Sequence, residues 1–172
     1  MAIEIERKFL VCSDDWRAAA TGSSSYAQAF LARTGESSIR VRRSDTHATI
    51  TVKGPRYGMA RYEFEYPIPV ADADHMLGRM SVTPIIEKVR HRVEHAGMIW
   101  EVDVYRGEAF GLVLAEVELN SIGQPFALPR WVGAEVTNDP RYRSDGIVRG
   151  LWRDADVAIA EAPVRSRVSR TA

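Results

Sequence analysis

The stretch Ile3-Glu4-Ile5-Glu6-Arg7-Lys8-Phe9-Leu10-Val11 alternates apolar and charged side chains along most of its length. In a β-strand, successive side chains point to opposite faces. A strand here puts Glu4, Glu6 and Lys8 on one face. The opposite face then carries the apolar Ile3, Ile5, Phe9 and Val11. Two carboxylates about 7 Å apart along a strand can hold a hard cation through oxygen, and a lysine beside them can bind a phosphate.

Similar alternation recurs along the rest of the chain. Tight-turn signals such as Gly54-Pro55 and Ala96-Gly97 separate several of the segments. Helical spacing is present over 70–80 and over 141–161, the latter as one helix or as two pieces around Gly146 and Gly150, whereas 120–133 looks irregular. Strands are expected over residues 2–11, 25–33, 37–44, 47–53, 60–68, 84–95, 98–106 and 112–119. Eight short strands joined mostly by tight turns predict an antiparallel barrel or a strongly curved sheet.

The charged faces of the expected strands are ordered by sign. Arg40 and Arg42 share one face, for example, and so do Glu116 and Glu118. An antiparallel sheet commonly turns its charged face to water, but solvated faces usually mix both signs. The alternative is an inside-out barrel, in which the apolar surface packs against helices and the charged surface lines a wide channel.

Such a channel would be electrically balanced. Its acids are Glu4, Glu6, Glu63, Glu65, Glu101, Asp103, Glu116 and Glu118. Its bases are Lys8, Arg40, Arg42, Lys53, Arg61, Lys88, Arg90 and Arg92. Because unpaired buried charges are costly, the channel must be wet, internally paired or filled by ligands. A polyphosphate with divalent cations suits both halves, since carboxylates bind the metal and Arg and Lys bind phosphate oxygens.

The composition narrows the class of protein. The 172 residues, 45% hydrophobic and 27% charged, suit one domain with an apolar core. No apolar run approaches the roughly 20 residues of a membrane helix, and acids stand where a signal peptide has its apolar segment. Cys12 is the only cysteine, which excludes an intramolecular disulfide, and we expect a cytosolic protein. Lys plus Arg equals Asp plus Glu at 23 each, which argues against a general nucleic-acid binder.

The motif Glu4-x-Glu6-x-Lys8 and its companions resemble those of CYTH-domain proteins, which are triphosphate tunnel metalloenzymes. A lone motif of this kind occurs by chance in many helices, but further motifs follow here in the family's order over roughly residues 1–152. These motifs are Ile39-Arg40-Val41-Arg42, Thr51-Val52-Lys53, Arg61-Tyr62-Glu63-Phe64-Glu65, Glu87-Lys88-Val89-Arg90, Glu101-Val102-Asp103, Glu116-Val117-Glu118-Leu119 and Glu135-Val136-Thr137.

The resemblance implies an α+β, mainly β fold, namely an eight-stranded antiparallel β-barrel tunnel with a charged interior and helices packed outside. The domain is expected over 1–162, with a disordered basic tail over 163–172. A C-terminal helix is expected to cover one tunnel mouth, and members of the family are often homodimers.

The resemblance also implies a ligand set, with Mg²⁺ or Mn²⁺ as cofactor and a small triphosphate as substrate. The expected metal ligands are Glu4, Glu6, Glu63, Asp103, Glu116 and Glu118, with Glu65 as a further acid. The expected phosphate-binding bases are Lys8, Arg40, Arg42, Lys53, Arg61, Lys88 and Arg90. No specific nucleic acid and no membrane is expected as a partner.

The leading functional hypothesis is metal-dependent hydrolysis of a small triphosphate, with inorganic tripolyphosphate ahead of other substrates, releasing orthophosphate. Such chemistry rests largely on positioning and electrostatics, and Lys8 or Lys88 would help protons move. The alternatives are a nucleoside or thiamine triphosphatase, a class IV adenylate cyclase, and a non-catalytic polyphosphate- or nucleotide-binding module.

One departure from the family pattern bears on catalysis. Small bacterial members often carry Gln-Gly-Tyr-Leu in the second strand, with the tyrosine in the tunnel, where it is thought to work with the signature lysine. This chain reads Gln28-Ala29-Phe30-Leu31, so no hydroxyl is present at that position. The substitution is either a tolerated aromatic exchange or a sign of altered catalysis or substrate range. Tyr26 has the same strand parity but stands four residues earlier.

Overall fold

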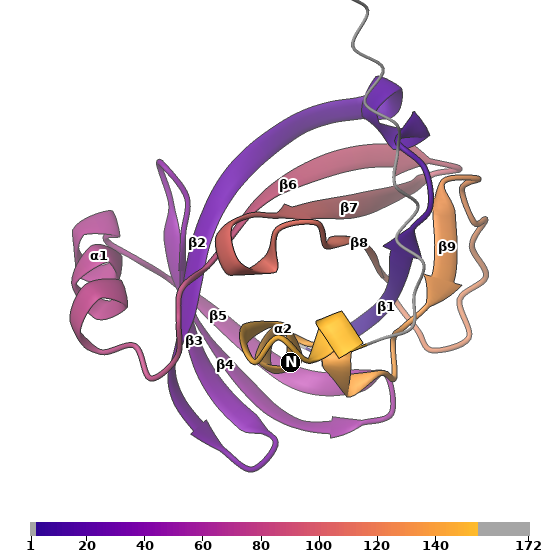
Figure 1. The fold of residues 1–172 in the computed structure, drawn as a ribbon. Helices are drawn as coiled ribbons and strands as arrows, with labels where there is room; N and C mark the ends of the chain where they lie inside the picture. Colours follow the sequence, from indigo (N-terminus) through magenta and orange to yellow (C-terminus); the bar gives the residue numbers. More distant parts are fainter. Residues whose placement is uncertain (1–2, 155–172) are drawn as a thin grey trace, which may run out of the picture.

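The computed structural model describes residues 3–154 of the chain. Its strands are β1 (Ile3–Val11), β2 (Ala20–Thr34), β3 (Ser37–Arg43), β4 (Ala48–Tyr57), β5 (Ala60–Ile68), β6 (Ile86–His95), β7 (Met98–Tyr105), β8 (Val113–Glu118) and β9 (Val132–Glu135). They form one sheet in the order β5-β4-β3-β2-β6-β7-β8-β1-β9. An additional pairing between β5 and β1 closes eight of the strands into a ring (Figure 1). The expected eight-stranded antiparallel barrel is confirmed.

Strand β1 is the seam of the ring. Its first residues pair with β5, with Glu4 opposite Arg61, and its middle pairs with β8, with Glu6 opposite Glu118 and Lys8 opposite Glu116. Its last residues pair with the short strand β9. Because side chains alternate along a strand, this register turns the charged residues of β1 and β8 toward the same interior.

Two apolar clusters cover the outside of the barrel. Around β1, β7 and β8, the buried Phe9 and Trp100 pack with Trp16 of the 3-10 helix η1 (Asp15–Ala19) and with Trp131. On the other side, helix α1 (Val70–Arg79) lies against β2 and β3 in Figure 1. Its buried Ala73 and Leu77 belong to a cluster that also holds Ala29, Val41 and Ala48. The apolar faces of the strands therefore point outward, as the inside-out interpretation requires.

A third cluster lies inside the barrel at one end. It lies where the strands meet the C-terminal segment of the described chain, so the interior of the barrel is apolar there. That segment consists of the 3-10 helix η3 (Pro140–Tyr142), helix α2 (Ser144–Val148) and the 3-10 helix η4 (Leu151–Asp154), and Figure 1 shows α2 across the ring. The cluster joins Ile86, Tyr105 and Leu114 of the strands to Tyr142, Ile147 and Trp152. We call the three helical pieces the plug.

Some boundaries differ from those expected. Strand β2 begins at Ala20, not near 25, because pairing with β6 extends to Ala20 opposite Val93. Its polar first half, residues 20–25, has no apolar alternation to reveal this. Strand β9 lies at the end of the region expected to be irregular, recruited by the free edge of β1.

The helix expected over 141–161 is broken into short pieces within the described residues. Helix α2 ends at Val148, and Gly150 then takes a positive φ of 71° before η4. The break expected at Gly150 is therefore present, whereas Gly146 lies within α2 and does not interrupt it. The rest of that range, and the expected tail over 163–172, lie outside the described residues.

Candidate active site inside the barrel

A cavity of about 550 Å³ occupies the interior of the barrel. It gathers charged residues that stand far apart in the sequence, because neighbouring strands present the same parity. All seven expected phosphate-binding bases line it, and so do all the expected metal ligands except Asp103. Further lining residues are Glu65, Arg92, Glu101, Tyr105 and Ser144.

One group of ion pairs joins β6, β7 and β8. Asp103 is 0% exposed and accepts hydrogen bonds from Lys88 Nζ at 2.5 Å and from Arg90 Nε at 2.7 Å. Arg90 also contacts Glu101 and lies 2.6 Å from Glu116 Oε2. Asp103 therefore sits behind the cavity wall, where it holds the two cations that line the wall.

A second group joins β1, β4 and β5. Glu4 accepts hydrogen bonds from Lys53 Nζ at 3.1 Å and from Arg61 Nε at 2.5 Å. Lys53 also lies 2.5 Å from Glu63 Oε2. Between the two groups, Lys8 Nζ lies 2.5 Å from an oxygen of Glu116. Almost every carboxylate in the cavity thus has a cation beside it, which lets so many charges share a partly buried space.

The two candidate catalytic lysines differ in electrostatic surroundings. Burial and the Arg90 guanidinium lower the pKa of Lys88 to about 8, although Asp103 opposes this shift. Burial would also lower the pKa of Lys8, but the Glu116 and Glu6 carboxylates outweigh it and raise that pKa above its usual value. Lys88 therefore exchanges its proton closer to neutral pH than Lys8 does.

The acids of β1 and β8 have the chemistry of a cation site. Glu6 and Glu118 are directly opposite in the register, and Glu118 makes no ion pair within the described chain. Burial and the Glu116 carboxylate raise the pKa of Glu6, so negative charge is in excess here. Carboxylate oxygens in excess are the donors that Mg²⁺ and Mn²⁺ prefer. With the side chains as they stand in residues 3–154, no three His, Cys, Asp or Glu groups are close enough to enclose an ion.

Three aromatic residues of the barrel interior bear on the missing tyrosine. Phe30 is buried and faces inward opposite Arg40, with the Arg33 guanidinium 5.3 Å from its ring centre. Tyr26 packs under Arg42 and does not line the main cavity. Tyr105 does line it, so a tyrosine ring is present in the cavity on a different strand.

Sequence reasoning missed Tyr105, Arg56 and Arg143 as residues of the barrel interior. Tyr105 continues the parity of Glu101 and Asp103, so extending the alternation by one step would have found it. Arg56 follows an irregularity in the pairing between Lys53 and Arg56, which breaks the parity argument. Arg143 lies in the plug, whose placement no strand pattern predicts.

Comparison with known proteins agrees with this geometry. The CYTH domain family matches residues 2–148. The chain belongs to the CYTH-domain family. A protein named inorganic triphosphatase from Acetivibrio thermocellus is 40% identical over 154 residues, covering 90% of this chain and 98% of the relative.

Two further comparisons point the same way. A protein named inorganic triphosphatase from Nitrosomonas europaea is 33% identical over 153 residues, covering 86% of this chain and 98% of the relative. The crystal structure of the inorganic triphosphatase NE1496 superposes with a TM-score of 0.60 at 32% identity, over 84% of this chain and 97% of that one. The CYTH barrel described here is therefore similar to an experimentally determined one. None of the helices in the described residues is long and apolar enough to span a membrane.

Proposed function

We propose that this protein is an inorganic triphosphatase that hydrolyses tripolyphosphate with the help of a divalent cation. The observation that carries the proposal is the main interior cavity, in which seven expected phosphate-binding bases and five expected metal-binding acids meet. The names of the similar proteins from Acetivibrio thermocellus and Nitrosomonas europaea support the choice of substrate.

The residues divide by chemistry. Glu6, Glu116 and Glu118 are the acids best suited to hold Mg²⁺ or Mn²⁺, with Glu4 and Glu63 beside the Lys53 side of the cavity. A bound divalent cation would neutralise phosphate charge and favour formation of hydroxide from water. The arginines and lysines bind phosphate oxygens and stabilise the charge that spreads during phosphoryl transfer.

Lys88 is the stronger candidate for proton transfer. Its lowered pKa, about 8, places it nearer to working pH than Lys8, and efficient acid or base catalysis needs such a match. We assign Asp103 a positioning role, since it is fully buried and bonded to both Lys88 and Arg90. This assignment replaces the expected role of Asp103 as a metal ligand.

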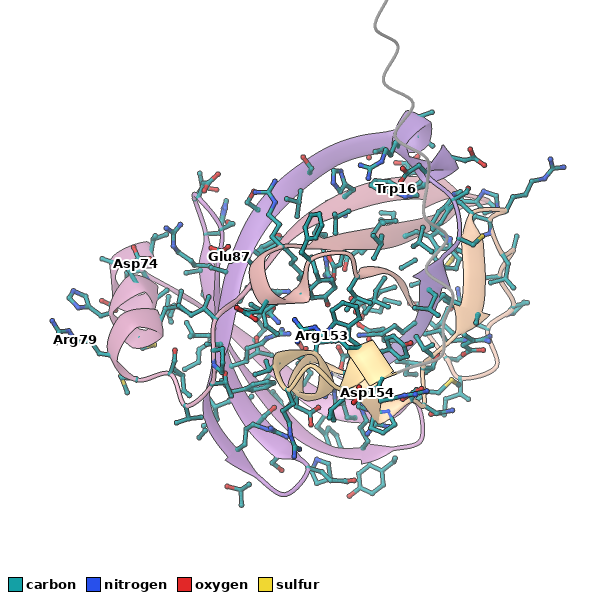
Figure 2. All side chains as sticks on the ribbon, in the orientation of Figure 1. Trp16, Asp74, Arg79, Glu87, Arg153 and Asp154 are labelled. Atoms are coloured by element: carbon teal, nitrogen blue, oxygen red, sulfur yellow. The ribbon has the colours of Figure 1, made fainter. Side chains whose placement is uncertain are left out.

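The enzyme is tested by phosphate release from tripolyphosphate, ATP and thiamine triphosphate, each with Mg²⁺, Mn²⁺ or EDTA. We expect metal-dependent release, fastest from tripolyphosphate, and a loss of at least tenfold in Glu6→Gln. The control with the same change of charge is Glu87→Gln. Glu87 is exposed and does not line the cavity, and Figure 2 labels it. Release that continues in EDTA, or that survives in Glu6→Gln, would contradict the proposal.

A non-catalytic binding module is the second candidate, because Phe30 offers no hydroxyl where related proteins often have one. Binding of tripolyphosphate without release of phosphate, in either metal, would favour it. Release of pyrophosphate and a cyclic nucleotide from ATP would indicate a cyclase instead.

Two broader assignments complete the proposal. The enzyme acts as a homodimer, joined through the outer face of β4 and β5, where Val52, Tyr62, Phe64 and Tyr66 are exposed side by side. Exposed apolar patches of this kind mark interaction surfaces. The enzyme works in the cytoplasm, in keeping with a single cysteine and no intramolecular disulfide.

A further inference from the structure

Three arginines of the barrel interior lack the ion pairs that the other interior cations make. Lys8, Lys53, Arg61, Lys88 and Arg90 each lie within salt-bridge distance of a carboxylate. Within the described chain, the three exceptions that face a common space are Arg40, Arg56 and Arg143.

The unpaired nitrogens are buried. The Nε atoms of Arg40, Arg56 and Arg143 are all shielded from solvent and have no hydrogen-bond partner among residues 3–154. Arg40 is only 7% exposed, and the one hydrogen bond that its side chain donates within the described residues goes to Thr51 at 3.5 Å. Arg143 donates one from Nη2 to the Asn138 carbonyl oxygen, also at 3.5 Å. A buried donor on a charged group is unfavourable when it has no partner, because it has lost its hydrogen bonds to water without replacing them. Such a cost is retained in a protein when a ligand supplies the missing acceptor.

These side chains line a pocket of about 150 Å³ beside the main cavity, which we call the arginine pocket. It shares Lys8, Arg40, Lys53 and Arg61 with the main cavity, so the two spaces adjoin. Seven basic side chains line it against two acidic ones, Glu36 and Asp145. Asp145 is bonded to Arg33 at 2.9 Å, and Lys8, Lys53 and Arg61 are paired with carboxylates of the main cavity. The three arginines without an ion pair therefore face one remaining acid, Glu36, and the pocket keeps an excess of positive charge.

The arginine pocket differs from the main cavity in one chemical respect. None of the expected metal-binding acids lines it, whereas five of them line the main cavity. An anion in this pocket would therefore be held by guanidinium groups without a bridging metal. Planar guanidinium groups match phosphate oxygens well.

The electrostatics agree with this reading. Burial and the Arg61 guanidinium lower the pKa of Arg56, and burial and Arg42 lower the pKa of Arg40. Both guanidinium groups thus sit among positive neighbours with too little negative charge around them. An incoming phosphate would relieve that repulsion.

We propose that the arginine pocket binds the metal-free terminal phosphate of the substrate, and thereby favours triphosphates that are charged at both ends. The proposal rests on the triphosphatase function proposed above and names its substrate class. Inorganic tripolyphosphate can place one end among the acids and bases of the main cavity and the other among Arg56 and Arg143. A nucleoside triphosphate with its phosphates in the main cavity would present its uncharged nucleoside to the arginine pocket.

The test compares substrates in Arg56→Gln, Arg143→Gln and the double variant, since glutamine keeps polarity but not charge. With Mg²⁺, we expect the double variant to raise KM for tripolyphosphate at least tenfold and to change KM for ATP less than twofold. The control is Arg79→Gln on α1, whose side chain Figure 2 shows outside the barrel. Thermal unfolding identifies variants that fail to fold. If the double variant does not fold, the same KM comparison is made with the two single variants.

A binding measurement separates this inference from the enzyme assignment. Calorimetric titration of tripolyphosphate in EDTA should show at least tenfold weaker binding to the double variant than to the wild type. Weaker binding of tripolyphosphate to the double variant, with no hydrolysis by the wild type or any variant, would support the pocket and contradict the proposed triphosphatase activity. Hydrolysis with unchanged tripolyphosphate affinity, or with equal losses for tripolyphosphate and ATP, would overturn the pocket and leave the triphosphatase standing.

Discussion

At the scale of single residues, the interior of the barrel depends on a few carboxylates that orient cations. Asp103 illustrates this, because its two oxygens accept bonds from Lys88 and Arg90 while the residue itself stays out of the cavity. Removing one member of a buried pair leaves the other charge uncompensated. The cations in the cavity wall are therefore fixed in place before any substrate arrives, which lowers the cost of binding.

The lowered pKa of Lys88 predicts how activity depends on pH. The ammonium form binds phosphate, and it is lost as pH rises through about 8, so kcat/KM for tripolyphosphate should fall above that pH. In Lys88→Arg the guanidinium stays charged throughout, so the fall should disappear even if the maximum rate is lower. The measurement is kcat/KM from pH 6 to 10 for both proteins, with their unfolding temperatures compared at each end. If kcat/KM falls equally at alkaline pH in both proteins, deprotonation of Lys88 is not the cause.

At the scale of elements, the plug depends on a glycine. A Cβ added at Gly146 of α2 would lie 2.3 Å from the Pro140 carbonyl oxygen and 2.6 Å from that of Arg141, so α2 could not pack on η3. Gly146→Ala should destabilise the protein by about 1–3 kcal/mol or more. The matched control is Gly78→Ala in α1, where a Cβ meets nothing within 4 Å. That change should stabilise by about 0.5–1 kcal/mol, since Gly is a poor helix former.

Denaturant unfolding of the two alanine variants measures both effects. Equal stabilities for Gly146→Ala and Gly78→Ala would mean that the plug does not require the close approach seen in the structure. Loss of tripolyphosphate hydrolysis in Gly146→Ala at temperatures where it remains folded would show that the plug also supports the adjoining cavity.

The elements also show what a sequence can predict. Strands such as β1 and β7 were predictable because one of their faces is apolar and the other charged, so parity fixed both the strand and the direction of each side chain. Parity predicted eight interior bases, Arg92 among them, and all eight line the cavity. The expectation that seven of them bind phosphate came from the resemblance to the family. Strand β9 and the first half of β2 were not predictable, because their pairing comes from neighbouring strand edges and not from their own pattern. Arg56 and Arg143 were missed for the related reason that a pairing irregularity and a tertiary contact place them.

At the scale of the whole molecule, charge and apolar surface are sorted into separate regions. The interior holds the charged residues with most of them paired, and the outside is apolar where η1, α1 and the β9 segment cover it. The face of β4 and β5 keeps Tyr62, Phe64 and Tyr66 exposed in the described part of the chain. The grouping of these large apolar side chains on one face supports it as the proposed contact with a second copy.

The proposed homodimer predicts a specific effect of charge on that face. Phe64→Glu should convert the protein to a monomer at micromolar concentration, because a charge at the centre of an apolar interface is desolvated without a partner. Light scattering coupled to size exclusion measures the mass, and Phe110→Glu, at another exposed phenylalanine outside that face, is the control that should leave it unchanged. Because Phe64 points away from the cavity, the monomer should keep most of its tripolyphosphate hydrolysis. If the wild-type protein is already a monomer, the proposed homodimer is wrong. The proposed chemistry of the cavity would be unaffected, since the residues of the cavity all come from one chain.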